Sequence, residues 1–462
     1  NRQGRYGVTR KMDLVAGFVI AHQEGYGFLS PESGEPDGFI PPKYMAELMH
    51  GDKILARVKD VDERGRKDYA PVEILERAQK RIVGKLTVQQ GVWSLIPDNR
   101  RLTHRLIIPA GALGGGKAGQ VVIGEITAYP SRYQQPIGKV VAVLGEAMAA
   151  GMEVDIAIEN HNIPAEFPEA VRAQCETIPD ALRDSDYEGR LDLRHLPFVT
   201  IDGISARDFD DAVYAEKRGE NYRLYVAIAD VAHYVQPDSP LDIEAYNRGT
   251  SVYFPDRVIP MLPEKLSNGL CSLNPDVERL CMVCDMVITY AGNIKEYRFY
   301  PAVMRSHARL TYNQVWGWIS DDLDHPHKAQ IDTLYKLFKI LQKKRFERGA
   351  VEFESVETQM LFDDNGKIEK IVPVVRNDAH KLIEECMLAA NVCAAEFLIK
   401  NKHTALFRNH LGPTPEKLAT LREQLGLLGL QLGGGDNPAE ATTSQLRGNA
   451  AMVFQDTVLA DA

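Results

Sequence analysis

The sequence has few cysteines, no long apolar run and no excess of positive charge. Six cysteines in 462 residues are too few for a disulfide framework, so we expect reduced thiols in an apolar core: Cys175, Cys271, Cys281, Cys284, Cys386 and Cys393. No stretch approaches the ~20 consecutive apolar residues that a membrane-spanning helix needs, and no apolar signal-peptide core follows the polar first residues. These absences argue against a membrane protein and favour a cytoplasmic one.

The net charge of -10 is unevenly distributed along the chain. Residues 1–160 contain 21 Lys and Arg against 19 Asp and Glu, so the acidic excess lies in the remainder. Whole-chain charge governs solubility and non-specific association, whereas specific binding depends on local basic faces or on metal-filled acidic pockets. The acidic total therefore argues against indiscriminate binding and leaves a nucleic-acid ligand open.

The length and the changes of pattern along the chain indicate three domains. Residues 1–80 contain short alternating runs separated by turn residues, which are typical of a small closed β-barrel, and residues 81–152 contain a second such set. Residues 153–462 mix longer helical stretches with strands, which indicates a larger α+β domain. Residues 456–462 stop within a helical pattern, so we expect the natural chain to continue and this domain to be incomplete.

Aromatic residues in the first predicted barrel lie in glycine-flanked strand segments: Phe18, Tyr26, Phe28 and Phe39. Alternation can bring several rings to one outer face, where each would stack on a base with about 1–3 kcal/mol, while nearby lysines attract phosphates. The alternative is that the rings fill the barrel core. This arrangement resembles the cold-shock domain, which binds single-stranded nucleic acid. The second barrel is a weaker match, with Trp93 and either Tyr129 or Tyr133 as its candidate rings.

Four aspartates carry the strongest chemical signal. An apolar strand ends at Asp202, a glycine-containing loop follows, and Asp208, Asp210 and Asp211 come close together after it. Clustered carboxylates repel one another, divalent cations relieve that repulsion, and hard oxygen ligands favour Mg²⁺ or Mn²⁺ over zinc. Two such ions ~4 Å apart can orient water and stabilise the leaving oxygen in phosphodiester hydrolysis. The alternative is a solvated acidic turn; an EF-hand fits poorly because its glycine and closing glutamate are absent.

The segment at residues 205–212, Ser-Ala-Arg-Asp-Phe-Asp-Asp-Ala, resembles the ribonuclease II and ribonuclease R family of hydrolytic 3′-to-5′ exoribonucleases. The sequence of this segment resembles bacterial ribonuclease R more closely than ribonuclease II. The similarity continues through further segments, which are residues 225–235, 248–255, 259–267, 308–312 and 382–391. The resemblance implies two N-terminal OB-type β-barrels, which are cold-shock domains, followed by an α+β ribonuclease catalytic domain.

The same resemblance implies roles for individual residues. The four aspartates would bind metal and position the attacking water, with Asp210 the most critical of them. Tyr253 and Tyr312 would contact the terminal nucleotides, Glu384 would lie near the 3′-terminal sugar, and Phe353 would stack on the far side of the bound bases. The alternatives are core packing for the two tyrosines and an ordinary surface charge for Glu384. The family's paired arginines before a Tyr-Pro-Asp motif, and its further OB-type domain, are not in this sequence.

The implied activity is processive hydrolysis of single-stranded RNA from a free 3′ end to nucleoside 5′-monophosphates, with Mg²⁺ or Mn²⁺ in a two-metal mechanism. We expect a cytoplasmic monomer, with the ribosome or the RNA-decay machinery as further partners. Two other functions stay open: an RNA-holding regulator built on a decayed nuclease domain, and an unrelated two-metal phosphoesterase acting on small molecules. The presence of all four aspartates opposes the first, and the tandem barrels oppose the second.

Overall fold

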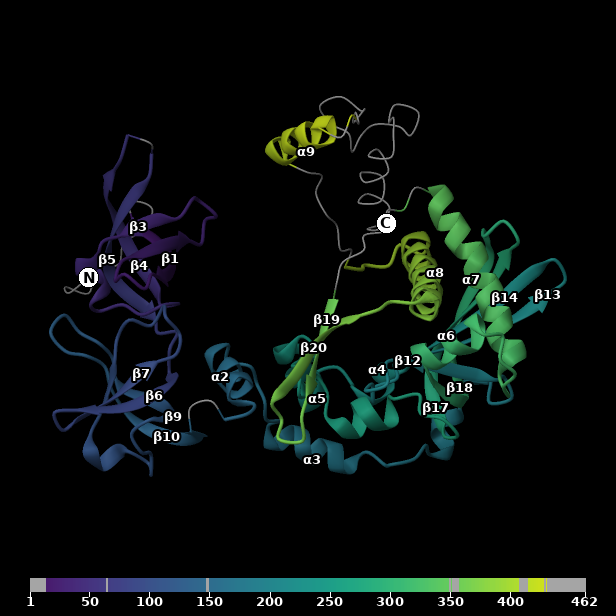
Figure 1. Cartoon of the computed structure of the whole chain (residues 1–462), viewed down its shortest axis with the longest axis horizontal. Coiled ribbons are helices and arrows are strands. Elements are labelled where there is room, and N and C mark those ends of the chain that lie inside the picture. Colours follow the sequence, from purple (N-terminus) through teal and green to yellow (C-terminus); the bar gives the residue numbers. More distant parts are fainter. Residues whose placement is uncertain are drawn as a thin grey trace. The chain divides into compact units, whose positions relative to one another are not determined.

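The computed structural model describes residues 14–63, 65–146, 149–348, 350, 357–406, 414–427 and 429. They divide into two units (Figure 1), the first comprising the residues up to Glu166 with Tyr253–Ile259 and Met360–Lys370. All six cysteines are buried and free, which confirms the expectation of reduced core thiols. Among the helices described, none combines the length and the apolar character needed to cross a bilayer.

The first unit begins with a closed five-stranded barrel in the order β1-β2-β3-β5-β4. Its elements are β1 (Leu14–Ala21), β2 (Gly27–Pro31), β3 (Gly38–Ile40), α1 (Pro42–Met45), β4 (Lys53–Val61) and β5 (Lys67–Glu76). The inward positions Val19, Leu29 and Ile40 are fully buried, as the two-residue period of a strand requires. Gly38 lets its strand approach the buried ring of Tyr69, since a Cβ at this position would collide with that ring.

A second closed barrel follows, in the order β10-β8-β7-β6-β9. Its elements are β6 (Arg81–Gln89), β7 (Val92–Pro97), β8 (Leu106–Ile108), η2 (Ala110–Ala112), β9 (Gln120–Ala128) and β10 (Ile137–Glu146), followed by α2 (Met152–Asn160). Leu86, Leu95 and Leu106 form its core, and α2 packs Met152 against Val83 on its outside. The two barrels confirm the predicted architecture of the N-terminal part.

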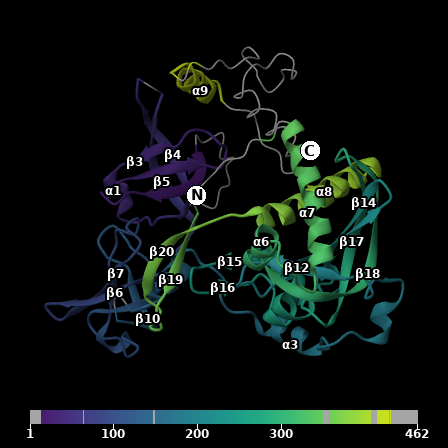
Figure 2. The same cartoon turned by 45° about the vertical axis from the view of Figure 1, so that its right-hand side comes forward.

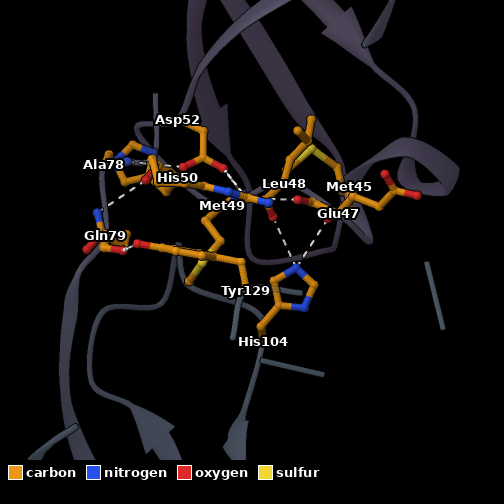
Figure 3. Close-up of polar contacts among 11 residues, drawn as sticks. Met45, Glu47, Leu48, Met49, His50, Asp52, Ala78, Gln79, His104 and Tyr129 are labelled. Atoms are coloured by element: carbon orange, nitrogen blue, oxygen red, sulfur yellow. Dashed lines mark hydrogen bonds and ion pairs between the residues drawn. The ribbon is translucent and has the colours of Figure 1, made fainter. Parts of the chain in front are cut away.

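The two barrels share a buried junction (Figure 3). Met49 of the first barrel packs into the core of the second. Next to it, the fully buried Asp52 accepts hydrogen bonds from the Met49 N–H at 2.9 Å and from Arg77 Nη1 at 2.8 Å. The Arg77 guanidinium lies 4.7 Å from the centre of the Tyr129 ring. Met49 and the contact of Arg77 with Tyr129 therefore join the barrels, and the buried carboxylate of Asp52 fixes the position of Arg77.

Polar contacts surround this junction. His104 Nε2 lies 3.2 Å from the carbonyl oxygen of Met45 and 3.1 Å from that of Leu48, so it is the protonated nitrogen and donates to both (Figure 3). The Tyr129 hydroxyl donates to the carbonyl of Gln79 at 3.0 Å. The sequence grouped Tyr129 with candidate base-stacking rings, whereas the structure places it between the barrels.

The second unit is built on a six-stranded sheet in the order β11-β18-β12-β13-β14-β17. Its strands are β11 (Leu191–Asp192), β12 (Phe198–Asp202), β13 (Asp211–Arg218), β14 (Asn221–Ala229), β17 (Glu278–Thr289) and β18 (Ile294–Thr311). The long β18 pairs antiparallel with β17 along its first part and parallel with β12 along its last part. β18 is therefore hydrogen-bonded to both β12 and β17, the first and last strands of the run β12-β13-β14-β17. Two short strand pairs include residues of the first unit: β15 (Val252–Tyr253) with β16 (Val258–Ile259), and β19 (Glu357–Phe362) with β20 (Ile368–Val374).

Helices cover both faces of the sheet. One face packs against α6 (Tyr312–Ser320), α7 (Lys328–Arg348) and α8 (Asp378–Lys400), and α7 contacts α8 over it (Figure 2). Val199 and Val213 face this core, whereas their neighbours Phe198 and Ala212 face the opposite core, because successive strand side chains alternate. The remaining helices are α3 (Glu169–Thr177), η3 (Asp184–Tyr187), α4 (Val231–Tyr234), α5 (Pro240–Arg248), η4 (Lys265–Leu270) and α9 (Pro415–Leu427). The predicted α+β class is confirmed.

Candidate active site

The four aspartates lie where β12 ends and β13 begins. β12 ends at Asp202, β13 begins at Asp211, and the two strands run antiparallel with Val199 opposite Val213. Antiparallel pairing therefore puts the end of one strand beside the start of the next. Asp208 and Asp210 lie on the loop that connects these ends, so all four carboxylates belong to one edge of the sheet.

Burial and mutual repulsion act together on these carboxylates. Burial raises the pKa of Asp211 to about 6, and the charges of Asp202 and Asp210 add to the shift. Burial also raises the pKa of Asp202 and of Asp210, and the charge of Asp208 contributes to both. The ionised cluster is thus disfavoured without a counter-charge, which is the situation that a hard divalent cation relieves.

The donor set fits such a cation in its chemistry, because it consists of carboxylate oxygens alone. Among the residues that the structure describes, no three His, Cys, Asp or Glu side chains lie close enough together to hold a metal ion. The roles of Asp202, Asp208, Asp210 and Asp211 as metal ligands therefore stay a prediction, supported by their shared edge and their electrostatic interaction.

Phe209 and Arg309 hold the loop that carries the aspartates. Phe209 is 4% exposed and anchors the loop in the core on the sheet face opposite α6 to α8. Arg309 Nη2 donates to the carbonyls of Ile204 at 2.7 Å and Ala206 at 3.2 Å, and its guanidinium lies 5.1 Å from the Phe209 ring centre. The sequence did not single out Arg309, although it belongs to one of the segments of family resemblance.

Tyr312 lies beside the aspartates because of strand register. Thr311, the last residue of β18, is paired with Asp202, the last residue of β12. The Thr311 side chain then caps α6, which begins at Tyr312. Burial raises the pKa of Tyr312 to about 12, with the Asp202 carboxylate contributing, and the ring stacks on His380 at 3.9 Å between centres. The structure thus brings a flat, two-ring surface next to the predicted metal ligands.

Glu384 lies on α8 one turn after His380, so both side chains share a helix face. It forms ion pairs with Arg345 at 2.9 Å and with Arg376 at 2.5 Å. Burial opposes its ionisation, but the two arginines outweigh burial and lower its pKa. Arg345 also pairs with the buried Glu385 at 3.0 Å. Glu384 is therefore a fixed, half-buried anion, not the ordinary surface charge considered as the alternative, and its contact with a sugar stays a prediction.

The structure does not place two further predicted nucleotide contacts relative to this edge. Phe353 lies outside the described residues. Tyr253, at the end of β15, belongs to the first unit, whereas the aspartates belong to the second. Its side chain is 63% exposed, which does not match the core-packing alternative. The contacts of both residues with RNA stay predictions.

The predicted aromatic surface forms on the outside of the first barrel. The ring of Tyr26 lies 5.8 Å from that of Phe28 and 5.6 Å from that of Phe39, and the last two lie 6.0 Å apart. Phe18 is 45% exposed, with Lys53 Nζ 5.6 Å from its ring centre. Since aliphatic side chains occupy the inward positions, the alternative that these rings fill the core is wrong.

Three family models match the chain. The RNB domain matches residues 190–457, which include every predicted metal ligand, and this match alone covers more than half of the chain. The Ribonuclease B OB domain matches residues 17–74, and the Cold shock domain matches residues 95–168. The order of the three agrees with the two barrels followed by the α+β unit.

Similar proteins share this organisation. The chain is 47% identical over 451 residues to Ribonuclease R of Escherichia coli (strain K12) and 48% identical over 454 residues to that of Vibrio cholerae. Each match covers 96% of this chain but 56% and 55% of those proteins. The structure of Mycoplasma genitalium RNase R in complex with ribose-methylated single-stranded RNA matches with a TM-score of 0.87 and 27% identity, over 96% of this chain and 70% of that one. The chain therefore belongs to the RNB-domain ribonuclease family that includes bacterial ribonuclease R.

Proposed function

We propose that this chain carries out metal-dependent hydrolysis of single-stranded RNA, from a free 3′ end and processively, to nucleoside 5′-monophosphates. The observation that carries the proposal is the cluster of interacting carboxylates at one sheet edge, beside the stacked ring of Tyr312, in a chain of this family. Because the chain spans little more than half the length of these relatives, the activity of the whole proteins is a proposal for this chain.

Each group at the edge has a distinct part in the proposed reaction. Asp202, Asp208, Asp210 and Asp211 would hold Mg²⁺, or Mn²⁺ in its place. When bound, the ions would supply an activated water and stabilise charge on the phosphoryl oxygens. Tyr312, held flat against His380, offers a face for the terminal base or sugar, and the guanidinium of Arg309 offers positive charge near the backbone phosphate.

The Glu384 carboxylate is suited to orienting the 3′-terminal nucleotide. Its two arginine partners keep it ionised and fixed in one position, so its oxygens are acceptors only. A ribose hydroxyl can donate a hydrogen bond to such an acceptor. This arrangement favours a free 3′-hydroxyl end.

A direct test uses single-stranded RNA labelled at its 5′ end, incubated with the chain and Mg²⁺. We expect the labelled full-length RNA to be converted to a short end fragment with little accumulation of intermediates, and no reaction when a chelator removes the metal. The released nucleoside 5′-monophosphates are identified by chromatography. Release of nucleoside diphosphates only with added inorganic phosphate would show phosphorolysis instead. RNA binding without any cleavage would support the RNA-holding regulator, and cleavage of small phosphodiesters with no effect on RNA would support the small-molecule phosphoesterase.

Replacing Tyr253 by alanine should lengthen the final undigested fragment. If the ring holds bases near the 3′ end, its loss lets short intermediates dissociate earlier, while the Tm changes little because the side chain is 63% exposed. Gel analysis of digestion products, together with thermal unfolding, measures both effects. Tyr246→Ala, at a 90% exposed tyrosine of α5, is the matched control and should leave the fragment unchanged. An unaltered fragment in the Tyr253 variant would remove this residue from the RNA path.

Replacing Phe28 and Phe39 together by alanine should weaken the capture of long RNA. Two stacking rings are lost, and at about 1–3 kcal/mol each their removal should raise the Kd for a long single strand at least tenfold. Cleavage of short oligonucleotides, which need not reach the first barrel, should change less. Fluorescence anisotropy at fixed salt measures the Kd, since phosphate contacts make affinity salt-dependent. The paired change Val72→Ala and Leu75→Ala, at exposed aliphatic positions of β5, is the control.

The remaining predictions from the sequence stay predictions. They are the domain limits at residues 1–80, 81–152 and 153–462, a monomeric state, action in the cytoplasm, and the ribosome or the RNA-decay machinery as partners. Size-exclusion chromatography with light scattering would test the monomer, and limited proteolysis with mass spectrometry would test the domain limits.

A further inference from the structure

Ser272 lies two residues after η4 and is fully buried. Its hydroxyl makes two hydrogen bonds to the loop that carries the aspartates. The Oγ atom accepts from the N–H of Phe209 at 3.0 Å and donates to the carbonyl of Arg207 at 3.0 Å. These two residues flank Asp208, so a single side chain fixes the backbone on both sides of that aspartate.

The backbone next to Asp208 makes further hydrogen bonds to other segments. The carbonyl of Phe209 accepts from the N–H of Leu273 at 2.8 Å, and the carbonyl of Asp210 accepts from the N–H of Ala229 at 2.9 Å. Ser272 is itself held, because its carbonyl accepts from Arg279 Nε at 2.8 Å. The backbone carbonyls of Phe209 and Asp210 are therefore hydrogen-bonded to other segments of the second unit.

We infer that Ser272 is a positioning residue for the metal-binding aspartates, acting through the backbone on both sides of Asp208. The loop from Gly203 to Asp210 has no regular secondary structure to fix its side chains, so its geometry depends on such individual contacts. Four like charges drive the loop apart, and a ligand that is displaced slightly binds a metal ion less well. This inference rests on the proposed metal-dependent function and names a residue that supports its site without touching metal or RNA.

The test compares Ser272→Ala with Ser306→Ala. Ser306 is also a fully buried serine of the second unit, and its hydroxyl donates one hydrogen bond, to the carbonyl of Ala308 at 3.1 Å. Mn²⁺ binding is measured by electron paramagnetic resonance on each protein without RNA, and Tm, kcat and KM are measured alongside. Ser272→Cys, with a weaker hydrogen-bonding group of similar size, tests the role without deleting the side chain.

We expect Ser272→Ala to weaken Mn²⁺ binding by about 10–100-fold, the usual effect of losing a group that orients metal ligands, and to lower kcat with KM for RNA nearly unchanged. Ser272→Cys should fall between this variant and the wild type. Ser306→Ala should lower the Tm and leave Mn²⁺ affinity unchanged. Wild-type affinity in both Ser272 variants would overturn the inference while leaving the proposed function intact, whereas a wild-type chain that binds no Mn²⁺ would overturn both. If Ser272→Ala does not fold, the Ser272→Cys measurement decides.

Discussion

Asp210→Asn abolishes RNA cleavage, by ~10³-fold or more, and leaves RNA binding nearly intact: this is the result we expect from the largest single change to the site. The substitution removes one charge from the group that would hold the metal ions, and stabilisation of charge at a phosphoryl group is worth several kcal/mol. The rings of the first barrel and the stacked Tyr312 are unaffected, so affinity for single-stranded RNA should persist. Single-turnover cleavage and fluorescence anisotropy measure the two effects separately.

Asp238→Asn is the control for this variant. Asp238 is an exposed aspartate of the same unit with a φ of 62°, a conformation that asparagine also adopts readily. Asp238→Asn removes the same charge from an exposed position of the same unit, and activity should stay at the wild-type level. Retention of more than a tenth of wild-type cleavage by Asp210→Asn would contradict the assignment of this residue.

Arg77→Met should lower the free energy of unfolding by about 3–5 kcal/mol. The substitution keeps most of the aliphatic stem but leaves the fully buried carboxylate of Asp52 without its cationic partner, and breaking one half of a buried pair is far more damaging than losing an exposed one. Burial already raises the pKa of Asp52 with Arg77 in place. In the variant, protonation of Asp52 removes the unpaired buried charge. Because the pKa of Asp52 is raised in the folded state, lowering the pH favours the folded state. The destabilisation should therefore shrink as the pH falls.

Urea unfolding of the wild type and the variant at several pH values measures this. Arg66→Met is the matched control, because Arg66 pairs with Asp62 at 2.7 Å in the same barrel but in an exposed position. An exposed pair contributes about 1 kcal/mol or less, so this change should be small. A loss below about 1 kcal/mol for Arg77→Met would show that the junction does not depend on its ion pair.

The sequence was sufficient for features that depend on local pattern. Alternation over Phe18 to Phe39 predicted an outer aromatic face, because a strand places every second side chain on the same side. The apolar run before Asp202 predicted a strand that ends there and a loop after it, and the structure has β12 ending at Asp202. Both rely on neighbours within a few residues.

Features that join distant segments were not predictable in this way. The position of Tyr129 depends on Arg77 of the other barrel, and the fixed charge of Glu384 depends on Arg345 of another helix. Ser272 has no motif of its own, and only the fold brings its hydroxyl to Phe209. Which distant residues come into contact depends on how the elements pack, and a single sequence does not show that packing.

The two-part pairing of β18 has a consequence for the order in which the molecule folds. Its first part closes a hairpin with the adjacent β17, which needs only a short loop, whereas its last part must find β12 from about a hundred residues earlier in the chain. Non-local parallel pairing of this kind is slow because the loop-closure entropy is lost before any contact forms. During synthesis Asp202 therefore cannot pair with Thr311 until β18 has been made. We expect the sheet edge that carries Asp202 and Tyr312 to form late in folding.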